Sequence, residues 1–224
     1  QFRCSPGGAA FQPGFPVGEA LFVVLEANGD GVDRRLVITL VVRVLLQREV
    51  LVGHRVGVVG IGGIGHLAVQ LLRAWGCEVT AFTSTASKRD EALQLGAHHA
   101  VSSVDLKELK SIAGTLDFLL VTVGASLEWD ALLGTLAPKG RLHMVGVVTE
   151  AMKVRTGGLL SWQRSISASP TASPSTLASM LAFSARHGIA PQVEHFPMSR
   201  VNDALEHLRA GKARYRVVLD ADFT

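Results

Sequence analysis

Short apolar runs alternate with segments of helical periodicity through the middle of the chain. The runs predict strands, and the segments between them, in which apolar residues recur at the spacing of one helix face, predict helices. The predicted strands are 55–60, 78–82, 100–102, 117–123 and 141–148, and the predicted helices are 64–75, 90–95, 104–113 and 127–136. Because strands and helices alternate, we expect an α/β protein with a doubly wound parallel sheet and right-handed crossovers.

The two ends of the chain show weaker patterns. Residues 1–20 are rich in proline and glycine and predict a loop. Residues 36–46 are apolar and predict either a strand or a buried helix, because periodicity alone cannot decide. The remaining predictions are strands at 20–26, 164–170, 192–196 and 214–220, and helices at 175–187 and 199–210.

A glycine motif joins the first strand of the alternating region to its helix. Gly60, Gly62 and Gly65 have the G-x-G-x-x-G spacing. The first glycine permits a tight turn, the second lets a pyrophosphate approach the backbone, and the third lets the helix lie close to the sheet. The alternative is a glycine-rich turn that binds nothing. The strand, helix and second strand around the motif favour a Rossmann-type dinucleotide site.

The residues after the second strand indicate which dinucleotide binds. Most NAD sites place an acid there for the ribose 2′-hydroxyl. This chain has three hydroxyl residues at 83–85, then Lys88 and Arg89, with no acid before Asp90. Hydroxyls and cations suit a 2′-phosphate, so we predict NADP. The alternative is that the hydroxyls cap the next helix and the cations are solvated.

The composition argues against a nucleic-acid-binding protein, a membrane protein and a disulfide-rich protein. A hydrophobic content of 48% is ordinary for a globular core, and a net charge of +3 is too small to indicate nucleic-acid binding. The longest apolar run, 36–46, is too short to span a bilayer, so we expect no membrane segment. Cys4 and Cys77 form neither a disulfide framework nor a metal-binding C-x-x-C motif. The cysteines fit a reducing compartment, and we predict a cytoplasmic protein.

Several motifs together resemble one family. They are the glycine segment 56–66, the hydroxyl and cation segment 83–89, and the runs 91–97, 165–169, 187–190 and 211–218. The chain from about residue 50 onward resembles the zinc-dependent medium-chain alcohol dehydrogenases, in their cinnamyl-alcohol-dehydrogenase-like branch. The resemblance implies a domain that binds NADP(H), and hydride transfer between a small-molecule alcohol and an aldehyde.

The resemblance also implies a set of cofactor-binding residues. They are Gly60, Gly62, Gly63, Ile64 and Gly65 for the pyrophosphate; Thr83, Ser84, Thr85 and Lys88 for the 2′-phosphate; Thr122, Val123, Val145 and Gly146 along the path from adenosine to nicotinamide; and Ser167 and Ser169 near the nicotinamide carboxamide. Ligands of doubly wound sheets lie outside the carboxyl ends of the strands, which independently favours residues 122–123 and 145–146. For His66 we favour packing or proximity to phosphate over catalysis.

The family carries zinc in an N-terminal catalytic domain, but this chain lacks the expected zinc ligands. Residues 1–49 are therefore interpreted as a remnant of that domain, 50–186 as the NADP-binding domain, and 187–224 as a segment that returns to the catalytic-domain side. In that arrangement 20–26 pairs with 214–220. We predict no metal site, and we assign no catalytic residue.

Three interpretations stay open: the NADP-binding part of a zinc alcohol dehydrogenase, a zinc-free NADPH-dependent reductase of the same superfamily, and a non-catalytic nucleotide-binding module. The resemblance also implies a homodimer, joined at the edge strand and the segment before it. Leu159, Leu160 and Trp162 would then be buried between subunits, because joining two sheet edges removes their exposure. The alternative is that these side chains cover their own sheet.

Overall fold

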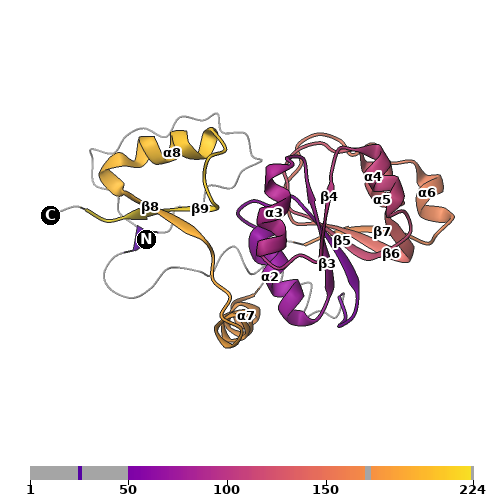
Figure 1. The fold of residues 1–224 in the computed structure, drawn as a ribbon, viewed down its shortest axis with the longest axis horizontal. Helices are drawn as coiled ribbons and strands as arrows, with labels where there is room; N and C mark the ends of the chain where they lie inside the picture. Colours follow the sequence, from indigo (N-terminus) through magenta and orange to yellow (C-terminus); the bar gives the residue numbers. More distant parts are fainter. Residues whose placement is uncertain (1–24, 27–49, 170–172, 223–224) are drawn as a thin grey trace.

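The computed structural model describes residues 25–26, 50–169 and 173–222 of the chain. The predicted segment 36–46 and Cys4 lie outside these residues. Across the described ranges the chain forms a large parallel sheet of six strands and a small parallel sheet of three (Figure 1). None of the helices in these ranges is both long and apolar enough to cross a membrane.

The large sheet confirms the predicted doubly wound α/β fold. Its strands lie in the order β4-β3-β2-β5-β6-β7, and each neighbouring pair is parallel. The strands are β2 Arg55–Val59, β3 Glu78–Thr83, β4 His99–Ser102, β5 Leu116–Val121, β6 Leu136–Met144 and β7 Ser165–Ala168, and the helices between them are α2 Gly65–Trp75, α3 Ser87–Gln94, α4 Leu106–Ser111, α5 Trp129–Gly134 and α6 Thr156–Leu160. Strand order reverses between β2 and β5, where doubly wound sheets bind their ligands.

The apolar strand β5 contributes side chains to two hydrophobic cores, one on each face of the sheet. Phe118 and Leu120 belong to the cluster that includes residues of α2, whereas Leu119 and Val121 belong to the cluster that includes residues of α5. Alternate side chains of a strand point to opposite faces, so a strand buried on both faces needs a continuous apolar run. This burial fixes β5 beside β2 at the centre of the sheet.

The boundaries of β6 differ from the prediction. The predicted helix 127–136 ends at Gly134, and the strand expected at 141–148 begins at Leu136 and ends at Met144. The reason is a register shift: Leu116 of β5 pairs with Leu136, but Phe118 pairs with Arg141. The extra residues between these pairs include Pro138 and Gly140, and they form an irregularity inside the strand.

The small sheet is formed by the end of the chain and one short upstream strand. Its order is β1-β9-β8, with β1 Leu25–Glu26, β8 Val193–Pro197 and β9 Arg216–Asp220. The turn η1 Met198–Arg200 and helix α8 Val201–Arg209 connect β8 to β9, and α7 Pro174–Arg186 precedes β8. Leu25 pairs with Leu219 and Glu26 with Asp220, which confirms the predicted pairing for these residues. Residues 20–24 lie outside the described part.

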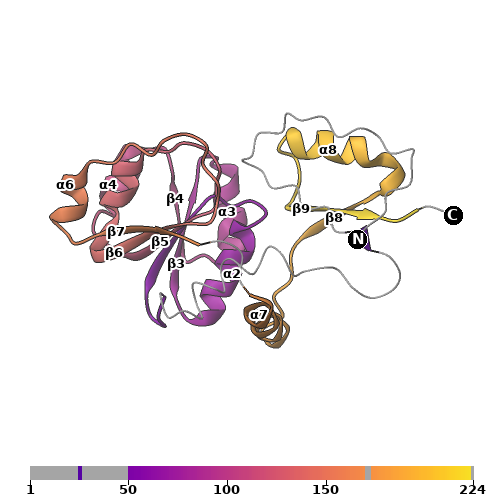
Figure 2. The same ribbon diagram turned by 180° about the vertical axis from the view of Figure 1, so that it is seen from behind.

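The residues just before β8 and β9 contact the glycine-motif side of the large sheet. The Tyr215 hydroxyl donates to Glu91 of α3 at 2.6 Å, and the Gln192 backbone N–H donates to the His66 ring at 3.3 Å. Figures 1 and 2 show the small sheet beside the part of the large sheet that carries α2 and α3. These contacts bring C-terminal residues to the carboxyl edge of β2.

Candidate dinucleotide-binding site

The glycine motif forms a tight turn between β2 and α2. Gly60 has φ +92°, which favours glycine, and a methyl group added there would overlap the Val123 side chain. A methyl group on Gly65 would overlap the carbonyl oxygen of Gly60. At Gly62, by contrast, an added methyl group would meet no atom of the described residues within 4 Å. The loop is therefore closely packed at Gly60 and Gly65 and open at Gly62.

Helix α2 presents its N-terminus at this open position. Its N-cap residue is Ile64, whose side chain has no hydrogen-bond acceptor, and its first turn begins with Gly65, His66 and Leu67. No carboxylate in that turn competes for its backbone N–H groups. The His66 N–H donates to the Gly62 carbonyl oxygen at 3.0 Å. The positive end of the helix dipole and the other N–H groups at the start of the helix favour an anion such as a pyrophosphate.

Arg216 of β9 lies directly against the glycine motif. Its Nε donates to the carbonyl oxygen of Gly63 at 3.0 Å, and its guanidinium carbon would lie 2.8 Å from a methyl group added at Gly63. Burial lowers the pKa of Arg216 to about 10, which still leaves the group charged at neutral pH. Sequence reasoning missed this cation. The available signal was an arginine directly before the apolar residues Val217, Val218 and Leu219.

His66 holds the motif to the C-terminal segment. Its Nδ1 lies 2.9 Å from the carbonyl oxygen of Gly62, its Nε2 accepts from Gln192 N–H, and its ring stacks on Tyr215 with centroids 4.6 Å apart. These partners require the neutral tautomer with its proton on Nδ1. Burial lowers the pKa of His66 to about 4, which keeps the ring neutral. The contacts fit packing rather than proton transfer.

The hydroxyl residues predicted for the 2′-phosphate follow the end of β3. Thr83 Oγ1 donates to the Thr85 carbonyl oxygen at 3.3 Å and accepts from its N–H at 3.2 Å, and Ser84 and Thr85 are exposed. The N-cap residue of α3 is Ala86, so the alternative that Ser84 or Thr85 caps this helix is wrong. The exposed hydroxyls thus stay available at the carboxyl edge of β3.

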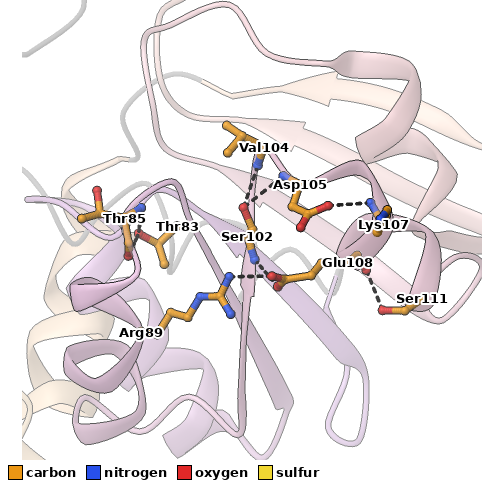
Figure 3. Close-up of polar contacts among 9 residues, drawn as sticks. All are labelled: Thr83, Thr85, Arg89, Ser102, Val104, Asp105, Lys107, Glu108 and Ser111. Atoms are coloured by element: carbon orange, nitrogen blue, oxygen red, sulfur yellow. Dashed lines mark hydrogen bonds and ion pairs between the residues drawn. The ribbon is translucent and has the colours of Figure 1, made fainter.

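The two cations of this region have different surroundings. Arg89 forms an ion pair with Glu108 at 2.7 Å, and the other Glu108 oxygen accepts from Ser102 N–H at 2.8 Å (Figure 3). The hydrogen bond from Arg89 holds the pKa of Glu108 below its usual range. Lys88 forms no ion pair within the described ranges. Of the two cations, Lys88 is therefore the one whose charge is available to a ligand.

The end of β5 packs against the same turn, and the end of β6 packs against the end of β5. Thr122 Oγ1 donates to the Gly60 carbonyl oxygen at 2.8 Å, and Val123 fills the space beside Gly60. Val145 N–H donates to the Val121 carbonyl oxygen at 3.0 Å, and a methyl group on Gly146 would overlap the Val123 backbone. The structure thus brings together the predicted residues at the ends of three neighbouring strands.

Ser167 and Ser169 lie further along the same edge. Ser167 is in β7, and Ser169 follows the strand directly. Both hydroxyls lie 2.8 Å from a ring nitrogen of His143 in β6. Sequence reasoning did not single out His143.

The described residues contain no group of three His, Cys, Asp or Glu side chains that could hold a metal ion. Cys77 is buried, and burial raises the pKa of its thiol to about 11. A thiol with such a pKa stays protonated at neutral pH. The donors of this part of the chain do not fit a zinc site.

Comparison with known proteins gives consistent matches. Residues 63–186 match the family model described as zinc-binding dehydrogenase. An aldehyde reductase from Synechocystis sp. is 53% identical over 165 residues, which is 74% of this chain and 49% of the relative.

Two solved structures extend the comparison. A cinnamyl alcohol dehydrogenase from Sorghum bicolor superposes with a TM-score of 0.77 at 33% identity, covering 82% of this chain and 52% of that one. A cinnamyl alcohol dehydrogenase from Helicobacter pylori, in complex with NADP(H), superposes with a TM-score of 0.73 at 26% identity, covering 83% and 53%. The chain spans about half the length of the curated relatives it matches.

Proposed function

The chain belongs to the zinc-binding dehydrogenase family, and from that premise we propose that it is the NADP(H)-binding part of an oxidoreductase that interconverts alcohols and aldehydes. The observation that carries the proposal is the open position at Gly62, beside the N-terminus of α2 and the Arg216 guanidinium. An anionic pyrophosphate fits this combination of open space, N–H donors and charge.

The preference for NADP over NAD rests on the edge of β3. Lys88 and the exposed hydroxyls of Ser84 and Thr85 offer a cation and donors to a 2′-phosphate, and no carboxylate lies between them in the sequence. Arg89 contributes indirectly, because its ion pair neutralises the nearby Glu108. The Helicobacter pylori cinnamyl alcohol dehydrogenase, which was solved in complex with NADP(H), also supports this choice.

Each predicted group of residues would contact or position one part of the cofactor. The loop from Gly60 to Gly65 binds the pyrophosphate, and Arg216 adds charge against the same loop. Thr122 fixes the turn through its bond to the Gly60 carbonyl oxygen. When bound, the nicotinamide ring supplies or accepts the hydride. The described residues bind and orient the cofactor, and the proposal assigns no proton transfer to them.

The proposed division of the chain follows from the same family. Residues 50–186 form the nucleotide-binding domain, and 187–224 return toward the residues that precede it, which the pairing of β9 with β1 supports. The substrate is a small alcohol or aldehyde. A zinc-free NADPH reductase is the second candidate, favoured by the lack of a three-ligand metal cluster in the described ranges.

We also propose that the chain forms a homodimer through the β7 edge. Leu160 is 77% exposed and Trp162 47% exposed on the segment before β7, and Ile166 of β7 itself is 37% exposed. Leu159, by contrast, packs against the chain's own core. An edge strand beside exposed apolar side chains is a surface that a second copy can cover.

Calorimetric titration with NADPH and NADH tests the cofactor proposal. One charge-assisted contact contributes about 1.5–3 kcal/mol, so NADPH should bind about tenfold to a hundredfold more tightly. Lys88→Ala should remove this preference, and the control Lys110→Ala, on α4, should keep it. Equal affinities for both cofactors in the native chain would refute the proposal.

Aldehyde-dependent oxidation of NADPH, measured with and without added zinc, separates the candidate functions. Turnover without zinc supports the zinc-free reductase. Tight NADPH binding with no turnover in either condition supports a chain that only binds the cofactor, either as the nucleotide-binding part of a zinc dehydrogenase or as a non-catalytic module.

A further inference from the structure

A buried histidine links the last two strands of the large sheet. His143 lies between Leu142 and Met144 in β6 and is only 2% exposed. It pairs in register with Ser167 of β7, and Ser169 lies two residues further along that chain. Because residues two apart on a strand share a face, both serines present their hydroxyls to the same imidazole. Each hydroxyl lies 2.8 Å from one ring nitrogen.

The chemistry of imidazole makes the two serines unequal. A neutral histidine has one N–H donor and one bare nitrogen acceptor. The serine that accepts from the N–H keeps its own hydroxyl proton for another partner. The serine that donates to the bare nitrogen has only acceptor capacity left. Either tautomer therefore leaves one hydroxyl as a donor and the other as an acceptor.

This pair lies where the second nucleoside of the cofactor is expected. Ser169 directly follows the last paired residue of β7, and its N–H donates to the Met144 carbonyl oxygen at 3.4 Å, at the carboxyl end of β6. Dinucleotides cross the point where strand order reverses, which is between β2 and β5. With the 2′-phosphate end at β3, the nicotinamide falls on the side of β5, β6 and β7.

We propose that His143 is a positioning residue for the nicotinamide carboxamide. It holds the hydroxyls of Ser167 and Ser169 so that one donates to the carboxamide oxygen and the other accepts from the carboxamide NH₂. A carboxamide presents one acceptor and one donor group, which matches the pair that a neutral imidazole leaves. The inference rests on the proposed function, since it requires NADP(H) at this edge.

A purely structural role would be the tethering of the edge strand β7 to β6. The same strands have a second tether in the hydrogen bond from Arg141 Nε to Ser165 Oγ, at 3.3 Å. That pair lies two residues earlier, away from the carboxyl edge. Ser165→Ala is therefore a matched control, because it removes a tether between the same strands without touching the serines proposed to contact the carboxamide.

The experiment compares two ligands by calorimetry on the native chain, His143→Leu, His143→Gln and Ser165→Ala. NADPH carries the carboxamide, and 2′-phospho-ADP-ribose lacks the nicotinamide altogether. His143→Leu should weaken NADPH binding about fivefold to tenfold, the effect of one or two neutral hydrogen bonds, and leave 2′-phospho-ADP-ribose unchanged. Glutamine keeps one donor and one acceptor, so His143→Gln should restore part of the NADPH affinity.

The outcomes separate this inference from the proposed function. Equal NADPH affinity in the native chain and His143→Leu would overturn the inference, and so would an equal loss for both ligands or the same selective loss in Ser165→Ala. If His143→Leu does not fold, as judged by circular dichroism, His143→Gln decides. An NADPH affinity lower than that of Ser165→Ala, with unchanged affinity for 2′-phospho-ADP-ribose, supports the inference. An NADPH affinity equal to that of the native chain overturns it. A native chain that binds neither ligand would refute the proposed function, and the inference with it.

Discussion

Replacement of Gly62 by alanine should abolish tight cofactor binding without harming the fold. Gly62 is not one of the glycines with a positive φ. A methyl group added at Gly62 would meet no atom of the described residues within 4 Å. The folded state therefore accepts alanine, and the lower entropy of the unfolded chain should raise the free energy of unfolding by about 0.4–1 kcal/mol. The methyl group would instead occupy the approach of the pyrophosphate.

The loss of affinity follows from the contacts that this methyl group prevents. Loss of one charge-assisted hydrogen bond to a phosphate costs about 1.5–3 kcal/mol, so the NADPH dissociation constant should rise about tenfold to a hundredfold. Calorimetric titration measures this change, and urea unfolding measures stability. Gly134→Ala is the matched control, since Gly134 of α5 also has open space around it. An unchanged dissociation constant in Gly62→Ala would refute the assignment of the glycine loop.

The packing, charge and exposure of other residues lead to four more expected results. Gly65→Ala should destabilise the chain by about 1–3 kcal/mol in urea unfolding, because its methyl group would overlap the Gly60 carbonyl oxygen; native stability would contradict this. The buried neutral His66 has a pKa near 4 in place of 6.5, so the free energy of unfolding should fall by up to about 3 kcal/mol as pH is lowered through this window, because the unfolded chain binds the proton first. His66→Gln should lack that part of the pH dependence, and an unchanged profile would count against it. Light scattering should show a dimer for the native chain and a monomer for Leu160→Asp; a native monomer would refute the dimer. Elemental analysis should find no tightly bound zinc, because the described residues offer no three-ligand cluster, and one zinc per chain would be the contrary result.

The local part of the fold was predictable from sequence. The unit β2-α2-β3 was predicted within a residue or so at most of its ends, because its signals are local: two apolar runs, a glycine motif and a helical period between them. The apolar run of β5 likewise predicted a strand, and the structure buries it on both faces. These elements positioned the candidate residues Gly60 to Gly65 and Thr122 correctly at the carboxyl edge.

Features set by long-range pairing were not predictable in the same way. The early start of β6 depends on the pairing of Leu136 with Leu116 across a register shift. Arg216 reaches Gly63 over 153 residues of chain, and Arg89 meets Glu108 from a different helix. The periodicity of the sequence does not indicate which arginine or lysine pairs with which carboxylate or carbonyl group. The charge assignment around the cofactor therefore required the structure.

The structure of the chain in complex with NADP⁺ tests the central claim most directly. The account predicts the pyrophosphate over the loop from Gly62 to Gly65, within reach of the Arg216 guanidinium, and the 2′-phosphate within hydrogen-bond distance of Lys88 Nζ. A nucleotide bound away from the glycine loop, or a 2′-phosphate that points away from Lys88, would contradict it.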